Sequence, residues 1–305
     1  MPGQPMAIDD GDADRTVGII GIGLLGSAIA DRLLAAGLSV WGCDTSAEAQ
    51  HAFAAKGGIS VLRPGDIPVA AHPIVLCLPN SDVVEQVLVD MIPRLKPGTT
   101  LIDTTTGESD RTIEMAERLA VADVDFLDAS VLGSSDVTRA GNAVLMVGSA
   151  PEPFQRVSHV LNAISANVMH VGPVGSGQQV KLVANLVLGL NRAALAEGLS
   201  FAKSLGLDLN LVLDVLKSGA AYSTVMDAKG RKMIDEDFEP QARLSQHLKD
   251  VRLMLKLATA SDTNLPLSLL HQQLLESAES AGHGDLDNSA IIRAWGRDGP
   301  PADAG

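Results

Sequence analysis

The chain has 305 residues, of which 46% are hydrophobic and 20% charged, a composition that is ordinary for a globular protein and excludes general disorder. Its 37 acidic residues outnumber its 23 basic ones, and the formal charge of −14 argues against a nucleic-acid partner, because phosphate binding requires a positive surface. At about 100–200 residues per domain, this length indicates two domains.

The ends of the chain, residues 1–14 and 297–305, have the composition of flexible tails. The first of them is acidic and has no apolar centre, unlike a signal peptide. The longest apolar stretch, residues 182–199, is interrupted by polar residues such as Asn185 and falls short of about 18 uninterrupted apolar residues. Two cysteines can build neither a disulfide framework nor a four-ligand zinc site. We expect a cytoplasmic protein that does not enter a membrane.

From residue 15 to about residue 175, short apolar runs alternate with amphipathic stretches. The apolar runs predict strands over residues 16–20, 38–43, 73–78, 99–103, 124–128, 143–147 and 168–171. The amphipathic stretches predict helices over 25–36 and 46–56, and two more beginning near Ser81 and Ser109, whose side chains can cap a first turn. This alternation predicts an α/β domain of the Rossmann type, a doubly wound parallel sheet with helices on both faces.

From residue 176 to about residue 296 the pattern is helical throughout. A long interdomain helix is predicted over 178–205, followed by helices over 210–217, 244–261, 265–281 and 288–295, the last with Asp287 as a candidate cap. We therefore predict a C-terminal all-α domain. The long helix has more apolar surface than one small domain covers, so we expect a homodimer or homotetramer.

A glycine-rich segment, Gly21-Ile-Gly-Leu-Leu-Gly26, lies between the first predicted strand and the first predicted helix. In this context the first glycine of G-x-G-x-x-G permits a tight turn, the second lets the backbone approach a pyrophosphate, and the third lets helix and strand pack closely. The helix N-terminus adds free N–H groups and a positive dipole end. The predicted dinucleotide-binding residues are Gly21, Ile22, Gly23, Leu24, Leu25 and Gly26.

Asp44 lies eighteen residues after Gly26, at the end of the second predicted strand. A carboxylate about 20 residues beyond the glycines accepts hydrogen bonds from the ribose hydroxyls of NAD and would repel the additional phosphate of NADP. The next residues, Thr45 and Ser46, are not basic. The sequence therefore favours NAD over NADP, with the alternative that Asp44 only caps the following helix.

Further segments accompany the glycine loop in a fixed order. They are Leu78-Pro-Asn80, Asp128-Ala-Ser-Val-Leu-Gly-Ser134, Gly175-Ser-Gly-Gln-Gln-Val-Lys-Leu-Val-Ala-Asn185, His247-Leu-Lys-Asp250 and Gly284-Asp-Leu-Asp-Asn-Ser-Ala-Ile291. The set resembles the β-hydroxyacid dehydrogenase superfamily, which includes 3-hydroxyisobutyrate dehydrogenases, tartronate semialdehyde reductases and glyoxylate/succinic semialdehyde reductases. The resemblance runs from about residue 15 to 296. It implies an NAD-binding domain over 15–175 and a helical domain over 176–296 that shapes the substrate pocket.

The resemblance also implies a catalytic lysine on the long helix, which acts as general acid/base at the substrate oxygen. The matching residue is Lys181, with Asn185 four positions on. Residues i and i+4 share one face of a helix, and desolvation in an apolar stretch can lower a lysine pKa toward neutrality. The alternative is that Lys181 extends to the surface and Asn185 binds a neighbouring backbone group.

Other cofactor contacts follow from the same resemblance. Thr106 would lie near the nicotinamide ribose, and the segment Leu78, Pro79 and Asn80 near the adenosine side. Lys249 matches a lysine of the second domain that closes over the cofactor. Its alternative is a helix-face charge paired with Asp250 or Asp237.

One segment departs from the superfamily pattern. The substrate loop usually reads Asp-Ala-Pro-Val-Ser-Gly-Gly, with the serine binding the substrate carboxylate, whereas here Ser130 replaces the proline and Leu132 the serine. Ser134 could supply a hydroxyl, and backbone N–H groups around Gly133 could bind an anion. Leucine should weaken recognition of a small carboxylate and favour a more apolar substrate.

Together these features predict an NAD-dependent oxidoreductase that interconverts a β-hydroxy acid, or a related alcohol, and its semialdehyde or ketone. Hydride transfer belongs to the nicotinamide, so no metal is needed. Two alternatives remain: an imine reductase on the same scaffold, against which Lys181 counts and for which Leu132 counts, and a non-catalytic NAD-binding sensor.

Overall fold

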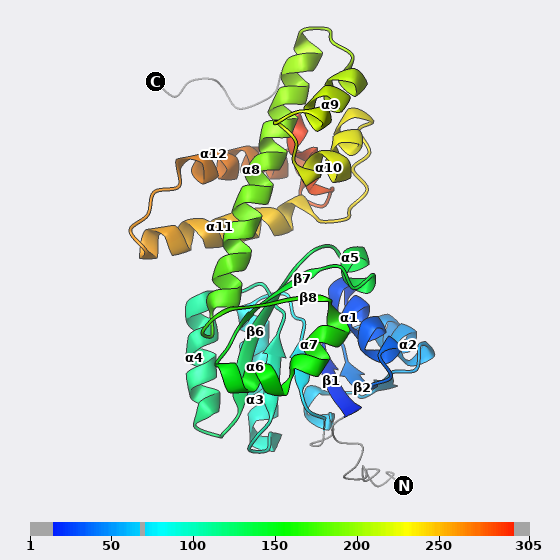
Figure 1. Cartoon of the computed structure of the whole chain (residues 1–305), viewed down its shortest axis with the longest axis vertical. Helices are drawn as coiled ribbons and strands as arrows, with labels where there is room; N and C mark the ends of the chain where they lie inside the picture. The colour runs from blue at the N-terminus through cyan, green and yellow to red at the C-terminus, as the bar shows by residue number, and fades with distance from the viewer. Residues whose placement is uncertain (1–14, 68–70, 296–305) are drawn as a thin grey trace. The chain divides into compact units, whose positions relative to one another are not determined.

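A computed structural model describes residues 15–67 and 71–295, so the expected tails, 1–14 and 297–305, lie outside the described residues. The chain divides into two compact units, Met1–Lys181 and Leu182–Gly305. Figure 1 shows the first unit in blue to green and the helices that follow α8 in yellow-green to red. The functional limits 15–175 and 176–296 remain a prediction.

The first unit contains an eight-stranded sheet with strand order β3-β2-β1-β4-β5-β6-β7-β8. Its strands are β1 Thr16–Ile20, β2 Ser39–Cys43, β3 Ile59–Ser60, β4 Ile74–Leu76, β5 Thr100–Asp103, β6 Asp125–Leu132, β7 Val144–Gly148 and β8 Asn167–Gly172. Every neighbouring pair is parallel except β6 and β7, which are antiparallel. The expected fold class is confirmed. One pair departs from the parallel arrangement, because the short connection between β6 and β7 cannot make a parallel crossover.

Helices cover both faces of this sheet. They are α1 Leu24–Ala35, α2 Ala47–Ala55, α3 Ser81–Met91, α4 Ser109–Ala120, α5 Ser135–Arg139, α6 Pro151–Arg156 and α7 Ser158–Ile164, with 3₁₀ turns η2 Pro64–Asp66 and η3 Ile92–Arg94. Consecutive strand residues enter opposite cores: Ile19 packs with α1 and α7, whereas Ile20 packs with α3 and α4. Strands buried on both faces explain why the sequence shows continuous apolar runs.

The helix caps differ from the expected ones at two positions. Ser46, where the second helix was predicted to begin, is the cap of α2 and accepts the Ala49 N–H at 3.2 Å. The cap of α3 is Asn80, which accepts the Val83 N–H at 3.1 Å. Ser81 and Ser109 instead lie inside the first turns of α3 and α4, because their helices begin one residue earlier than a serine cap requires.

The second unit is helical. Its elements are α8 Ser176–Ser204, which starts in the first unit, α9 Leu209–Ser218, α10 Thr224–Ile234, α11 Leu244–Ala260, α12 Pro266–Ala278, the π-helical turn η4 Glu279–His283 and the 3₁₀ helix η5 Asn288–Trp295. One core, which includes Leu199, Leu248 and Leu275, joins these elements. Asp287 caps η5 as predicted by accepting the Ser289 N–H at 3.1 Å. The helix α10 escaped prediction because its segment is rich in charged residues and has no clear apolar face.

Among the helices of residues 15–67 and 71–295, α8 is the one long and apolar enough to cross a membrane. Helices in the cores of proteins outside membranes share this length and composition. The helix also carries the buried polar residues Lys181, Asn185 and Arg192 along its length.

Candidate active site

The glycine loop follows β1 and opens α1, and its three glycines have different surroundings. Gly21 has a φ of +89°, and a Cβ on it would lie 2.2 Å from the Cys77 carbonyl oxygen. A Cβ on Gly26 would lie 1.9 Å from the Gly21 oxygen, whereas one on Gly23 would meet nothing within 4 Å. Gly21 and Gly26 therefore permit close packing, whereas Gly23 keeps the open side of the loop free of side-chain atoms.

The open side of this loop is suited to a negatively charged group. Gly23 is the N-cap of α1 and offers no side-chain cap. The N–H groups of the first turn and the positive end of the helix dipole therefore lie where a pyrophosphate would bind. The residues present thus fit a dinucleotide cofactor.

Asp44 follows β2 and contacts the glycine loop directly. One carboxylate oxygen accepts the Ile22 N–H at 2.6 Å, and the other accepts the Ser46 N–H at 2.7 Å. Asp44 lines a cleft of about 450 Å³ together with Gly23, Leu24 and Lys56. The carboxylate therefore connects the glycine loop to the start of α2, and its remaining lone pairs can accept ligand hydroxyls. The expected cofactor role and the alternative helix-start role are compatible here.

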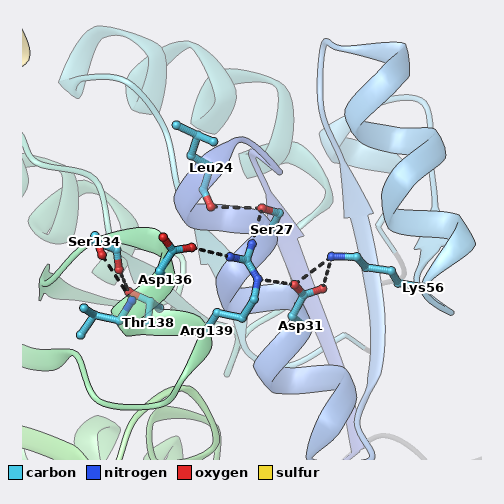
Figure 2. Close-up of polar contacts among 9 residues, drawn as sticks. Leu24, Ser27, Asp31, Lys56, Ser134, Asp136, Thr138 and Arg139 are labelled. Atoms are coloured by element: carbon cyan, nitrogen blue, oxygen red, sulfur yellow. Dashed lines mark hydrogen bonds and ion pairs between the residues drawn. The ribbon is translucent and has the colours of Figure 1, made fainter. Parts of the chain in front are cut away.

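A network of charges crosses the surface beside this cleft (Figure 2). Asp31 on α1 binds the Lys56 ammonium at 2.9 Å and the Arg139 Nε at 2.8 Å. Arg139 also contacts Asp136 at 3.3 Å and the Ser27 hydroxyl at 3.5 Å. Burial opposes ionisation of Asp31, but hydrogen bonds from Arg139 and Lys56 hold the pKa of its carboxyl below the usual range. At the edge of the cleft, the Lys56 ammonium is therefore paired with the Asp31 carboxylate.

The segments after β4 and β5 reach the same edge of the sheet as the glycine loop, because all four strands β2, β1, β4 and β5 are parallel. Leu78, Pro79 and Asn80 follow β4, and Thr106 follows β5. The strand order reverses direction between β1 and β4, which is the position where doubly wound sheets bind their ligands. The fold therefore assembles the predicted cofactor residues of this unit along one edge.

Gln178 binds the segment after β5 at two points, and this contact was not predicted. Its side-chain Nε2 donates to the Thr105 carbonyl at 2.5 Å, and its Oε1 accepts the Gly107 N–H at 3.0 Å. The side chain is fully buried. Gln178 therefore holds the loop that contains Thr106 against the first turn of α8.

Lys181 is buried, so the alternative that it extends to the surface is wrong. Its Nζ donates to the Val131 carbonyl at 2.5 Å. Val131 lies near the end of β6, within the predicted substrate loop. The ammonium group is therefore placed at this loop through a backbone contact.

The predicted substrate residues lie at and after the end of β6. Ser130 is fully buried within the strand, and Leu132 is its last residue. Gly133 has a φ of +147°, in the region that favours glycine. Ser134, labelled in Figure 2, is the N-cap of α5. Its hydroxyl accepts the Val137 N–H at 3.3 Å.

In the second unit, Asn185 donates through Nδ2 to the Asp250 carboxylate at 2.9 Å, and both side chains are buried. Lys249 forms an ion pair with Asp250 at 3.7 Å, which is the alternative expected for this lysine. Asp250 is therefore a partner common to two predicted site residues. Its pairing with Lys249 was among the alternatives expected from the sequence, whereas its contact with Asn185 was not.

Two buried carboxylates lie side by side beneath this edge of the sheet. Asp103 on β5 and Asp128 on β6 are register partners, and each is at most 1% exposed. Burial raises the pKa of Asp103 to about 7 and that of Asp128 to about 6. Within residues 15–67 and 71–295, no group of three or more His, Cys, Asp and Glu residues is arranged to hold a metal ion.

Two domain families match the sequence. The NAD-binding domain of 6-phosphogluconate dehydrogenase matches residues 16–172, and a family described as NAD-binding of NADP-dependent 3-hydroxyisobutyrate dehydrogenase matches residues 175–295. Both matches support a nicotinamide cofactor.

Whole-chain relatives agree with these families. The chain is 31% identical to 2-(hydroxymethyl)glutarate dehydrogenase of Eubacterium barkeri, with coverage of 92% of this chain and 94% of the relative. It is 30% identical to L-threonate dehydrogenase of Escherichia coli, again with 92% and 94% coverage. A crystal structure of 3-hydroxyisobutyrate dehydrogenase from Salmonella typhimurium is 30% identical, with a TM-score of 0.84 and coverage of 91% and 99%. The glycine loop, the lysine-bearing helix and these full-length matches together show that the chain belongs to the β-hydroxyacid dehydrogenase superfamily.

Proposed function

We propose that the protein is an NAD-dependent dehydrogenase or reductase that interconverts a β-hydroxy acid, or a related alcohol, and its semialdehyde or ketone. The observation that carries this proposal is the buried Lys181 ammonium, held at 2.5 Å from the Val131 carbonyl in the predicted substrate loop. A positioned ammonium group of this kind can protonate a carbonyl oxygen and accept the proton back.

In this proposal a bound nicotinamide supplies or accepts the hydride at the substrate carbon. Lys181 moves the proton at the substrate oxygen, and its contact with the Val131 carbonyl directs Nζ toward the loop that would hold the substrate. Asn185, whose amide donates to Asp250, is proposed to orient the substrate or the lysine from the same helix. Backbone N–H groups near Gly133 are proposed to bind an anionic group of the substrate, since Leu132 offers no hydroxyl.

The test is turnover followed by nicotinamide absorbance, with small hydroxy acids, their semialdehydes and bulkier neutral alcohols. The Lys181→Ala variant should lose about 10²–10⁴-fold in kcat. Lys203→Ala is the matched control, because Lys203 lies in the last turn of the same helix with an exposed side chain. Turnover only on bulkier or neutral compounds would keep the mechanism and change the substrate class. If the protein binds the cofactor but shows no turnover that requires Lys181, the imine reductase or the sensor would be favoured.

For the cofactor we propose NAD. The Asp44 carboxylate would repel an added phosphate, and the nearby Lys56 charge is paired with Asp31. The competing observation is the match to a family described as NADP-dependent. Asp44→Asn keeps an acceptor for the Ile22 N–H but removes the charge. We expect it to lower the ratio of kcat/KM for NAD over NADP at least about tenfold, and an unchanged ratio would refute the assignment.

We also propose that two or four copies assemble through the second unit. Val183, Val187 and Phe201 of α8 are each more than half exposed, as is Leu211 of α9. Sedimentation of the wild type and of Phe201→Glu tests this, since a charge in a buried interface should shift the protein toward monomer. The cytoplasmic location remains a prediction from the sequence.

A further inference from the structure

The start of α8 is hydrogen-bonded to a side chain of strand β6. Asp128 on β6 accepts the Gly175 N–H through one carboxylate oxygen at 2.7 Å and the Gln178 N–H through the other at 2.8 Å. N–H groups of a first helical turn have no partners within the helix, so an acceptor must come from elsewhere. Here it is a fully buried carboxylate from a residue 47 positions away. Hydrogen bonds to such an ionised acceptor are among the strong ones.

Glycines make room for this carboxylate. A Cβ on Gly148 would lie 2.3 Å from one Asp128 oxygen, and a Cβ on Gly177 would lie 2.7 Å from the other. Gly175 has a φ of +92°, which turns the chain so that its N–H reaches the same group. Three glycines on two segments thus permit one close approach.

The same strand and the same helix meet again at the lysine. Lys181 lies three residues after Gln178, about 4.5 Å further along the helix axis, and its Nζ donates to Val131, three residues after Asp128. The two hydrogen bonds to Asp128 therefore fix the start of α8 relative to β6. The hydrogen bond to the Val131 carbonyl fixes the position of the Lys181 ammonium group. If the first contact is lost, α8 can shift on β6 and the Lys181 ammonium loses its fixed position.

We infer that Asp128 is a positioning residue for Lys181, which acts by capping α8 from the strand that also holds the lysine ammonium. This inference rests on the proposed function, in which Lys181 transfers the proton. Gln178 extends the arrangement, because its side chain ties the same turn to Thr105 and Gly107 beside the predicted cofactor site. The first turns of α8 thus contact both the predicted substrate loop, through Lys181, and the segment that contains Thr106, through Gln178.

Asp128→Asn tests the inference, because the amide keeps one acceptor and places a donor against the other N–H group. The matched control is Asp125→Asn at the half-buried start of the same strand, where the carboxylate pairs with Arg156. The first readout is the rate at which Lys181 reacts with acetic anhydride, measured by peptide mass spectrometry against Lys56 in the same sample. The second is the separate measurement of kcat and of KM for NAD.

We expect faster acetylation of Lys181 in Asp128→Asn, with Lys56 unchanged, and a kcat about 10²-fold lower at nearly constant KM for NAD. Asp125→Asn should behave as the wild type in both. A folded Asp128→Asn protein with unchanged Lys181 acetylation and unchanged kcat would reduce Asp128 to a structural cap and overturn the inference. If Asp128→Asn does not fold, Asp128→Ser serves in its place, since its smaller side chain leaves room for a water to accept both N–H groups.

The two proposals fail in different ways. A wild-type protein without turnover on any substrate would refute the proposed function, and the acetylation rates would still decide whether Asp128 places Lys181. Normal wild-type turnover with identical acetylation and kcat in Asp128→Asn would refute the positioning role alone.

Discussion

Asp103 offers a test of how burial changes stability with pH. Its side chain is 1% exposed at the end of β5, where it accepts the Thr105 N–H at 2.9 Å beside Asp128 on the next strand. Burial raises the pKa of this carboxyl from 3.8 to about 7, and the charge of Asp128 acts in the same direction. The folded protein therefore holds the proton more tightly than the unfolded chain does.

The sign of the effect follows from this difference. The stability that the protonated Asp103 contributes is present in full below pH of about 4 and is lost as the pH rises toward 7. Linkage between a pKa of 3.8 and one of about 7 gives a loss of roughly 2–3 kcal/mol between pH 5 and pH 8. Asp103→Asn resembles the protonated acid and keeps an acceptor for the Thr105 N–H. It should therefore stabilise the protein by roughly 2–3 kcal/mol more at pH 8 than at pH 5.

Urea unfolding of the wild type and of Asp103→Asn at pH 5 and pH 8 measures this double difference. Asp136→Asn serves as the control, because its side chain is 86% exposed on α5 and should show almost no pH-dependent difference. If Asp103→Asn changes the free energy of unfolding equally at both pH values, the carboxyl is ionised in the fold and the argument from burial is wrong.

Two further predictions concern the glycine loop and the second unit. Gly23→Ala should keep the melting temperature but weaken NAD binding in a fluorescence titration, whereas Gly26→Ala should also destabilise the fold by about 1–3 kcal/mol, because its Cβ would overlap the Gly21 oxygen. Asp287→Asn should cost about 3 kcal/mol in urea unfolding, because it leaves the Lys229 ammonium, now 2.9 Å from the carboxylate, without a countercharge. Adding Lys229→Met should recover part of that loss, and no recovery would refute the pairing argument.

The parts of the fold that could be predicted are those in which neighbours in sequence decide the structure. Strands of the parallel sheet are buried on both faces and therefore appear as continuous apolar runs, and the spacing of Gly21, Gly23 and Gly26 is set by one turn. The cap of α3 is different, because Asn80 and Ser81 are adjacent and both suit a cap. Only the backbone shows that Asn80 has the extended conformation of an N-cap, while the Ser81 hydroxyl accepts the Glu108 N–H at 3.0 Å.

The site residues that escaped prediction depend on contacts between distant segments. Asp128 and Gln178 were within quoted segments, but only the fold shows that one caps the helix of the other. Asp250 likewise becomes a partner of Asn185 only when α11 packs beside α8. A polar residue inside an apolar run can be recognised in the sequence as unusual. The sequence does not show which residue, 50 or 65 positions away, forms its hydrogen bond.

The hydrogen bond of Lys181 does not depend on the serine that Leu132 replaces in the superfamily's loop pattern. The lysine donates to a backbone carbonyl, that of Val131, and this acceptor is present whatever side chains the neighbouring positions carry. Replacing the side chain at Leu132 therefore leaves this contact of Lys181 in place, and the Ser130 side chain is buried within β6. Under the proposed function, proton transfer and substrate choice would therefore be separable, because the Val131 carbonyl and Asp128 would position Lys181, while the side chains of the predicted substrate loop would select the substrate.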